Sequence, residues 1–329
     1  MPREFSTVIC VTSAQAHRQT DQHADITGHA SSCPAVSDSA MDKPSAQVIG
    51  LLHPGEMGAA VGRCLTDRGH TVLWAAHGRS PATAARAVAA GLTEAGTARQ
   101  VAEQAQVIIS VCPPHAALDV AWAVHGFTGI YLDANAIAPG TAREVAQLIT
   151  ANGGTYVDGG IIGPPPFPEK GLSRLYLSGE HAAAIRDLFE GTALEPLILS
   201  GSITAASAVK MAYAAWTKGT AALLLAARGL ARAEGVEDAL LSEWQLSQPQ
   251  LAGQSERSAR SAVTKGWRWV AEMEEIAHCM AGAGLPDGFH QAAAEIFRRC
   301  PRLPDTVPGE ETTRAVLAAL TGGNLAEPA

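Results

Sequence analysis

The sequence predicts an α/β fold, in which a parallel, doubly wound sheet is followed by an all-helical domain. Three observations support this prediction. Short apolar runs alternate with helical segments over residues 44–200, a turn with two glycines follows the first run, and the residues beyond 200 have helical periodicity. Strands and helices that alternate at this interval form βαβ units, whose connections place helices on both faces of a parallel sheet.

The composition excludes several classes of protein. The chain has 329 residues, a formal net charge of -8 and 47% hydrophobic residues. A chain of this length is expected to form about two domains, and its apolar fraction is too high for a disordered protein. The acidic balance argues against a nucleic-acid-binding protein, whose surface would be basic. The longest apolar run, 221–227, is far shorter than the ~20 residues that span a bilayer, so no membrane segment is expected.

The six cysteines favour a reducing compartment. No two of them form a C-x-x-C pair, and none lies in a Cys/His cluster with the spacing of metal ligands. Cys64 and Cys112 fall within apolar runs and are expected to be small core residues. We therefore expect a cytoplasmic protein without a metal site.

The two ends of the chain differ from the rest. Residues 1–43 are polar, lack periodicity and do not have the pattern of a signal peptide, so a disordered extension is predicted. Met41 immediately precedes the first folded segment, and one hypothesis is that it is the true start. Residues 304–329 are expected to be a loose tail that holds one short helical segment, 311–321.

Residues 44–200 are predicted to form the nucleotide-binding domain. Its first apolar run has no polar alternation, as expected of a strand that is buried on both faces. A helix ends at Gly69, and Ser80 followed by Pro81 is typical of a helix start. The predicted strands are 46–52, 70–76, 105–114, 129–135, 154–162, 173–179 and 194–201, and the predicted helices are 59–69, 81–90, 97–104, 115–125, 140–152 and 181–190.

The turn after the first strand matches part of a dinucleotide-binding fingerprint. In G-x-G-x-x-G, the first glycine makes the turn, the second lets the backbone approach the pyrophosphate, and the third lets the helix pack. The second and third glycines are present, and a histidine replaces the first. The N–H groups at the helix start would face the pyrophosphate, or the glycines serve the turn alone. The six positions, all predicted to contact the cofactor, are His53, Pro54, Gly55, Glu56, Met57 and Gly58.

The end of the second strand indicates which dinucleotide is bound. NAD-binding sites place Asp or Glu about 20 residues onward, where the acid holds the ribose hydroxyls. Here Arg79 and Ser80 occupy this place, and no acid is available. A guanidinium can pair with a 2′-phosphate through two hydrogen bonds, so we predict NADPH over NADH. The alternatives are a solvated surface arginine and a serine that only caps the helix.

The second domain, residues 201–303, is predicted to be helical. A run without proline covers 203–234, and because it is apolar on nearly every face it is expected to be a buried central helix. Its aromatic-rich neighbour at 264–284 is more typical of core or dimer contacts than of a substrate pocket. The further helices are expected at 236–250, 255–281 and 287–299.

One face of the central helix carries candidate catalytic side chains. Lys210, Tyr213, Ala214, Thr217 and Lys218 follow the i, i+3, i+4 pattern of one helix face. Burial of an ammonium lowers its pKa and makes it a general acid. Alternatively, the lysine side chain extends to the surface, and the residues alone leave these two interpretations about equal.

Three stretches together resemble a known family. The sequence VIGLLHPGEMG resembles the opening of the β-hydroxyacid dehydrogenases, relatives of 3-hydroxyisobutyrate and 6-phosphogluconate dehydrogenase. SAVKMAYAAWTKGTAALLLA and RWVAEMEEIA resemble a branch in which the Rossmann-type NAD-binding domain precedes a helical domain of unknown function. The resemblance covers about 46–300.

The resemblance implies an NAD(P)-dependent hydride transfer at a carbonyl or alcohol of a small molecule. It implies a catalytic lysine on the long helix, for which Lys210 is placed, with Tyr213 as the residue that orients the substrate or shares proton transfer. It also implies cofactor contacts at Pro113 and Asn135, a pocket between the domains, and a homodimer with interlocking helical domains.

The chain departs from the family pattern where that pattern holds a substrate carboxylate. Gly163, Pro164 and Pro165 replace a Ser-Gly-Gly, and Tyr213 or Ala214 replaces an asparagine. A neutral or aromatic ketone, alcohol or imine would suit this loop better than a simple 3-hydroxyacid. The positions expected to contact the substrate are Gly163, Pro164, Pro165, Ala214, Thr217 and Lys218.

Three functions remain in contention. The first is an NADPH-dependent oxidoreductase that uses Lys210 as its acid and base. The second is an imine reductase, which shares this architecture but often replaces the lysine. The third is a non-catalytic dinucleotide-binding sensor, which the glycine pair and Lys210 disfavour.

Overall fold

The computed structural model describes residues 46–166, 173–303 and 309–322. The predicted disordered extension and Met41 lie outside the described residues. Within them, no helix is long and apolar enough to cross a membrane.

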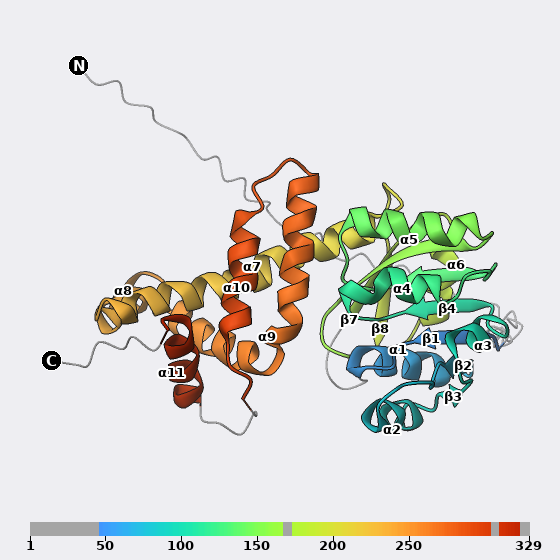
Figure 1. Cartoon of the computed structure of the whole chain (residues 1–329), viewed down its shortest axis with the longest axis horizontal. Coiled ribbons are helices and arrows are strands. Elements are labelled where there is room, and N and C mark those ends of the chain that lie inside the picture. Colours follow the sequence, from blue (N-terminus) through green and yellow to red (C-terminus); the bar gives the residue numbers. More distant parts are fainter. Residues whose placement is uncertain (1–45, 167–172, 304–308, 323–329) are drawn as a thin grey trace, which may run out of the picture. The chain divides into compact units, whose positions relative to one another are not determined.

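The predicted doubly wound sheet is confirmed, with eight strands in the order β3-β2-β1-β4-β5-β6-β7-β8 (Figure 1). Neighbouring strands run parallel except β6 and β7, which pair antiparallel. The order reverses between β1 and β4, which is where open α/β sheets bind ligands at the carboxyl ends of their strands. The strands are β1 (Val48–Leu52), β2 (Thr71–Trp74), β3 (Thr93–Glu94), β4 (Val107–Ser110), β5 (Ile130–Asp133), β6 (Thr155–Ile162), β7 (Ser173–Ser178) and β8 (Leu194–Ile198).

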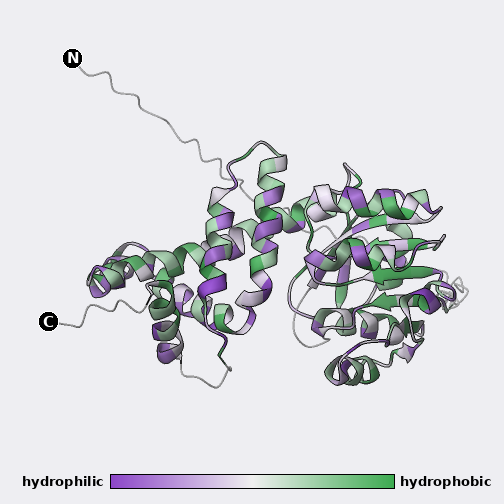
Figure 2. Ribbon diagram, viewed as in Figure 1, coloured by the Kyte–Doolittle hydropathy of each residue, from purple (hydrophilic) through white to green (hydrophobic). Residues whose placement is uncertain are grey.

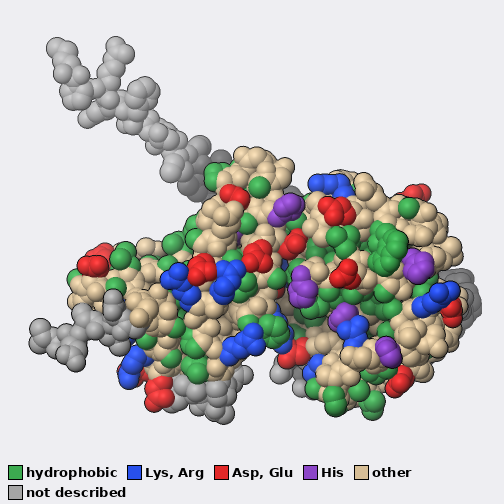
Figure 3. Space-filling model, in the orientation of Figure 1, with side chains coloured by type: hydrophobic (Ala, Val, Ile, Leu, Met, Phe, Trp, Pro, Cys, Tyr) green, Lys and Arg blue, Asp and Glu red, His purple; other side chains and the backbone are tan. Residues whose placement is uncertain are grey.

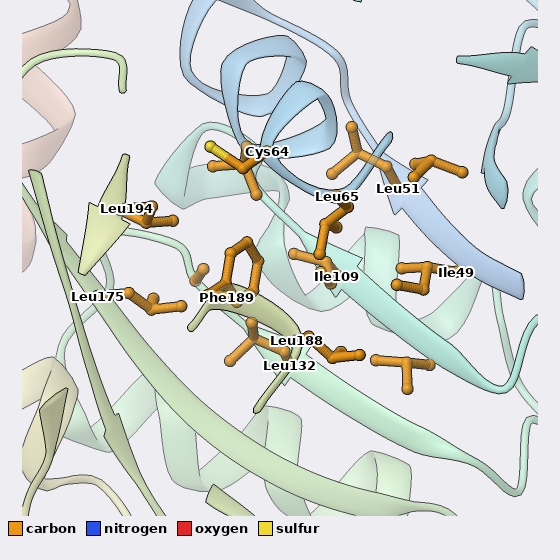
Figure 4. Packing of buried hydrophobic residues seen from close by; sticks show 14 of the residues in the cluster. Ile49, Leu51, Cys64, Leu65, Ile109, Leu132, Leu175, Leu188, Phe189 and Leu194 are labelled. Atoms are coloured by element: carbon orange, nitrogen blue, oxygen red, sulfur yellow. The ribbon is translucent and has the colours of Figure 1, made fainter. Parts of the chain in front are cut away.

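Helices cover both faces of the sheet. Successive residues of a strand point to opposite faces, so strands that are apolar throughout need a helical layer on each face. In β4, Ile109 joins the core under α1, α2 and α6, and Ile108 joins the core under α3, α4 and α5. Phe189 lies among leucines of several strands in the first of these cores (Figure 4). The helices are α1 (Glu56–Thr66), α2 (Pro81–Ala89), α3 (Ala98–Ala102), the short 3₁₀ helix η1 (Pro114–Ala116), α4 (Ala117–Trp122), α5 (Pro139–Ala151) and α6 (Ala182–Phe189).

Two strands differ from the expectation. β3 has only two exposed residues, so its sequence has no apolar run that predicts it. β7 was expected to be parallel, and it is antiparallel to β6. Ten residues, 163–172, separate these two strands, which is fewer than the dozen or more that a parallel crossover requires.

Five helices follow the sheet in the described part of the chain, and four of them contribute residues to one core. Met211, Leu225, Met273 and Phe297 are each at most 1% exposed in this core. The ribbon in Figure 2 shows apolar and polar residues on different sides of several of these helices. The helices are α7 (Ala205–Ala233), α8 (Glu237–Ser247), α9 (Gln250–Gly282), α10 (Gly288–Arg299) and α11 (Gly309–Leu320).

The short helical segment that was expected at 311–321 is helix α11. α11 packs on α7 and α9, and its Val316 and Leu317 side chains are fully buried. The division of the chain into domains at about residue 200 stays a prediction, since residues 45–329 form one compact unit.

The central helix α7 is not buried on every face, which corrects the expectation. Trp216 is 74% exposed and Leu230 is 65% exposed, whereas Leu225 is fully buried. The helices α9, α10 and α11 contact α7, and they leave its Trp216 and Leu230 side chains exposed. Part of the apolar surface of α7 is therefore not covered by the described residues of this chain.

Candidate functional site

A cavity of about 480 Å³ opens at the carboxyl ends of β1, β4 and β5. One wall is the turn between β1 and α1, and the opposite wall is formed by α9. The lining includes eight of the predicted site residues, which are His53, Gly55, Glu56, Met57, Gly58, Pro113, Asn135 and Lys210.

The two fingerprint glycines have different structural reasons. A Cβ at Gly58 would lie 2.3 Å from the backbone oxygen of His53, so the turn itself requires glycine there. A Cβ at Gly55 would meet nothing within 4 Å, and the φ of Gly55 is -69°. Neither the packing of the described residues nor the backbone conformation requires a glycine at position 55. A ligand that approaches the start of α1 closely would require one.

His53 adopts a conformation that normally favours glycine. Its φ is 69°, and it is the one non-glycine residue with positive φ among those described. Such a conformation costs of order 1–3 kcal/mol. The first fingerprint glycine is therefore replaced in sequence while its backbone conformation is retained.

The His53 ring contacts Arg79. The Arg79 Nη1 lies 2.6 Å from the imidazole Nε2, so the guanidinium donates and the ring accepts. Burial, followed by the charges of Arg79 and His115, lowers the pKa of His53 to about 4. The imidazole is therefore neutral at pH 7, as an acceptor must be.

Ser80 caps helix α2, and Arg86 lies within this helix. The Ser80 hydroxyl accepts from the Thr83 N–H at 3.3 Å and caps α2, as one of the two interpretations expected. Arg86 lines the cavity, and its Nη2 donates to the Thr83 hydroxyl at 3.2 Å. Arg86 was not predicted as a site residue, since a single arginine inside a helix carries no positional signal.

Asn135 connects the ends of β4 and β5. Its Oδ1 accepts from the Cys112 N–H at 2.6 Å, its Nδ2 donates to the Ser110 hydroxyl at 3.1 Å, and its backbone N–H donates to Asp133. Burial raises the pKa of Asp133 to about 7. The amide of Asn135 thus shapes the cavity floor chiefly through contacts within the chain.

Lys210 reaches the cavity from α7. Its Nζ donates to the Ile161 carbonyl oxygen at 2.8 Å. Burial lowers the pKa of this ammonium from 10.5 to about 8. The close approach of α7 depends on Gly160, where a Cβ would lie 2.6 Å from the Ala206 oxygen and 3.1 Å from Lys210 Cβ.

A buried carboxylate holds the start of α7. Asp158, fully buried in β6, accepts from the Ser207 N–H at 2.7 Å and from the Ser207 and Ser178 hydroxyls. A carboxylate at a helix N-terminus complements the unpaired N–H groups and the helix dipole. Because Ser207 is three residues before Lys210, this contact helps to fix where Lys210 lies.

Other predicted residues on α7 lie away from the cavity. Tyr213 is 50% exposed, Ala214 is buried in the helical core, and the Thr217 hydroxyl donates to the Tyr213 oxygen. Tyr213, Ala214 and Thr217 are not among the described residues that line the cavity. The role of Tyr213 in orienting the substrate or sharing proton transfer stays a prediction.

Lys218 makes an ion pair with Glu272, which itself lines the cavity. The two side chains are 17% and 15% exposed. Burial and the charge of Lys210 lower the pKa of Lys218 to about 6. Lys218 therefore contributes to the site through Glu272.

The predicted substrate loop is only partly described. Gly163 and Pro164 are exposed, and Pro165 lines a second, smaller cavity of about 310 Å³ beside α1 and α2. None of the three is among the described residues of the main cavity. The remainder of the loop, 167–172, lies outside the described residues.

Helix α9 supplies a wall that the sequence analysis assigned to core or dimer contacts. Trp267, Arg268 and Glu272 line the cavity, and Arg268 forms an ion pair with Glu56 at 3.0 Å. The Arg268 and Arg302 guanidiniums each lie 5.0 Å from the Trp267 ring centre, as in cation–π contacts. Periodicity predicts this helix but does not show which turn faces a cavity.

No group of three or more His, Cys, Asp and Glu side chains in the described ranges is arranged to hold a metal ion.

Two family models match the chain. Residues 47–194 match the NAD binding domain of 6-phosphogluconate dehydrogenase, and residues 231–300 match a domain of unknown function, DUF1932. The first range contains the fingerprint turn and Arg79. Lys210 lies between the two matched ranges.

Known proteins show similarity of sequence and of fold. An uncharacterised 28.5 kDa protein of Methanothermus fervidus is 28% identical over 195 residues, which cover 59% of this chain and 74% of that protein. A 3-hydroxyisobutyrate dehydrogenase of Mycobacterium tuberculosis, solved with L-serine, has a TM-score of 0.61 at 18% identity, covering 77% of this chain and 93% of that one. A reductive aminase of Aspergillus terreus, solved with NADPH and ethyl levulinate, has a TM-score of 0.50 at 21% identity, covering 78% and 94%.

Proposed function

We propose that this chain, which combines a 6-phosphogluconate dehydrogenase-type NAD-binding domain with a DUF1932 domain, is an NADPH-dependent oxidoreductase. The reaction is hydride transfer between nicotinamide and the carbonyl or alcohol of a small molecule. The single observation that carries the proposal is the position of Lys210. A buried lysine with a lowered pKa lies in the same cavity as the fingerprint turn.

The residues of the cavity fit a dinucleotide. Gly55 leaves open space at the start of α1, where backbone N–H groups favour a phosphate. Asn135 and Pro113 line the cavity further along, at the ends of β5 and β4. When bound, the nicotinamide supplies or accepts the hydride.

Lys210 is the general acid and the general base in this proposal. In reduction, its Nζ–H donates a proton to the substrate oxygen as the carbonyl carbon gains the hydride, and in oxidation its neutral amine removes the hydroxyl proton. A pKa of about 8 lets both forms exist near neutral pH. The Ile161 carbonyl, 2.8 Å away, orients the Nζ.

A second candidate is an imine reductase, and the specific observation in its favour is the fold shared with the reductive aminase. In that reaction the acceptor of the hydride is an imine carbon. The cavity wall of Trp267 and the ion-paired Glu272 suits a small neutral or aromatic substrate of either kind.

The direct test is a fluorescence titration with NADPH followed by a turnover screen of ketones, alcohols, hydroxyacids and cyclic imines. Oxidation of NADPH by ketones, lost in Lys210→Ala, supports the proposal. Turnover of imines alone supports the second candidate. Binding without turnover in the wild type indicates the non-catalytic sensor.

Arg79 is proposed to hold the 2′-phosphate of NADPH. A hydrogen bond between charged groups contributes about 1.5–3 kcal/mol, so Arg79→Ala should raise the KM for NADPH about 10-fold or more. The KM for NADH should change less than about 2-fold, since NADH has no 2′-phosphate. An equal effect on both cofactors, measured by steady-state kinetics, would reject the assignment.

Gly55→Ala tests the approach of the cofactor. The added methyl group meets nothing within 4 Å in the protein, so the free energy of unfolding should change by less than about 0.5 kcal/mol. NADPH affinity, measured by titration, should nevertheless fall by about 10-fold or more. Unchanged affinity would place the cofactor elsewhere.

The proposed partners are a small substrate and a second copy of the chain. The uncovered apolar residues of α7, among them Trp216 and Leu230, support a homodimer. On the face of the described residues shown in Figure 3, charges of both signs are interspersed, which gives no support for nucleic-acid binding. A cytoplasmic location is part of the same proposal.

A further inference from the structure

His53 combines two features that neither the fold nor its neighbours require. Its φ is 69°, a backbone conformation that glycine adopts without a clash. The other two glycine positions of the fingerprint, Gly55 and Gly58, do hold glycine. The His53 side chain contacts one residue of the next strand's loop, Arg79, at 2.6 Å. A strained residue with a specific polar partner at a cavity wall indicates a function for its side chain.

The contact connects two separate elements of the nucleotide site. His53 follows β1 and lines the cavity, whereas Arg79 follows β2 in the loop that ends at the Ser80 N-cap. The side chain of Arg79 would otherwise lose considerable rotamer freedom on binding an anion. Its Nη1 and Nη2 both lie near the His53 ring, at 2.6 Å from Nε2 and 3.5 Å from Nδ1, and the remaining guanidinium N–H groups are left for a phosphate.

The protonation of His53 suits this contact. Its ring nitrogen must be unprotonated to accept from a guanidinium, and burial and the charges of Arg79 and His115 hold the pKa of His53 near 4. The imidazole therefore accepts the hydrogen bond throughout the neutral range without adding a competing charge.

We propose that His53 is a specificity-determining residue, which holds the Arg79 guanidinium in place for the 2′-phosphate of NADPH. This inference rests on the proposed cofactor preference. His53 acts through Arg79 and is a positioning residue. His53 stands at the end of β1, whose neighbour in the sheet is β2, and from there its imidazole reaches Arg79 in the loop after β2.

The decisive variant is His53→Gly, which restores the ordinary fingerprint. It removes the imidazole and relieves the backbone, so the protein should unfold at the same or a higher temperature. The dissociation constant for NADPH, measured by fluorescence titration, should rise about 3- to 10-fold, and that for NADH should stay within about 2-fold. A loss of discrimination with a gain of stability cannot come from misfolding.

Two further variants separate positioning from structure. His53→Asn keeps an acceptor and tolerates positive φ, so it should retain part of the preference for NADPH. The double variant His53→Gly with Arg79→Ala should discriminate no less than Arg79→Ala alone, because the two residues act as one unit.

The outcomes distinguish this inference from the proposed function. If the wild type binds NADPH and NADH equally, the cofactor preference fails and this inference fails with it. If the wild type prefers NADPH and Arg79→Ala removes the preference, but His53→Gly keeps it, the inference alone is overturned. Additive effects in the double variant would also overturn it.

Discussion

Replacement of Lys210 by methionine is expected to lower kcat for carbonyl reduction by a factor of about 10² to 10⁴, the usual contribution of a positioned general acid. Methionine keeps the length and packing of the side chain but has no proton to donate. Since the ammonium of Lys210 is buried, its removal should leave the unfolding temperature unchanged or higher. Steady-state kinetics and thermal unfolding of the same preparation measure both effects.

The wild-type pH profile should have a defined sign. Reduction needs the protonated amine, so its kcat should fall as pH rises through about 8, the pKa of Lys210. Oxidation needs the neutral amine and should rise over the same range. Lys265→Met, at an exposed position of α9, is the matched control and should keep both profiles. A Lys210→Met enzyme with wild-type kcat and pH profile would exclude Lys210 as the acid.

Gly160→Ala is expected to damage stability and catalysis together. The new methyl group would lie 2.6 Å from the Ala206 oxygen and 3.1 Å from Lys210 Cβ, so α7 must shift away from β6. Overpacking of this kind costs about 1–3 kcal/mol of unfolding free energy, measured by urea denaturation. Turnover should fall further than stability explains, because the Nζ of Lys210 moves with the helix.

The control for this variant adds the same methyl group where there is room. At Gly282, the last residue of α9, a Cβ meets nothing within 4 Å. Gly282→Ala should therefore keep wild-type turnover and stability. If Gly160→Ala keeps wild-type kcat as well, the close packing of α7 on β6 does not position Lys210.

Local signals predicted much of the fold. The run at Val48–Leu52 is buried on both faces, the cap at Ser80 starts α2, and the run without proline forms the single helix α7. The strand β7 was predicted, but its antiparallel direction was not, because direction depends on the length of a connection rather than on strand composition. The exposed pair Thr93–Glu94 forms β3 only through its pairing with β2.

Sequence alone indicates a site residue when its role follows from its place in a motif. The fingerprint turn and Lys210 line one cavity, and the roles predicted for them stay predictions. Tyr213 and Thr217 were grouped with Lys210 by helix spacing, but the helix turns them out of the cavity. Trp267 and Glu272 could not be assigned, because their position depends on how α9 packs across the sheet edge.

The buried Asp158 has a consequence for how separable the two halves of the chain are. Its carboxylate belongs to the sheet, and its shortest hydrogen bonds come from Ser207 on the far side of the predicted boundary at residue 200. A fragment that ends at 200 would keep the acid with the Ser178 and Tyr156 hydroxyls as its remaining side-chain donors, and it would lose both contacts from Ser207. The NAD-binding half is therefore not an interchangeable module. In evolution it would have to be exchanged together with the first turn of α7.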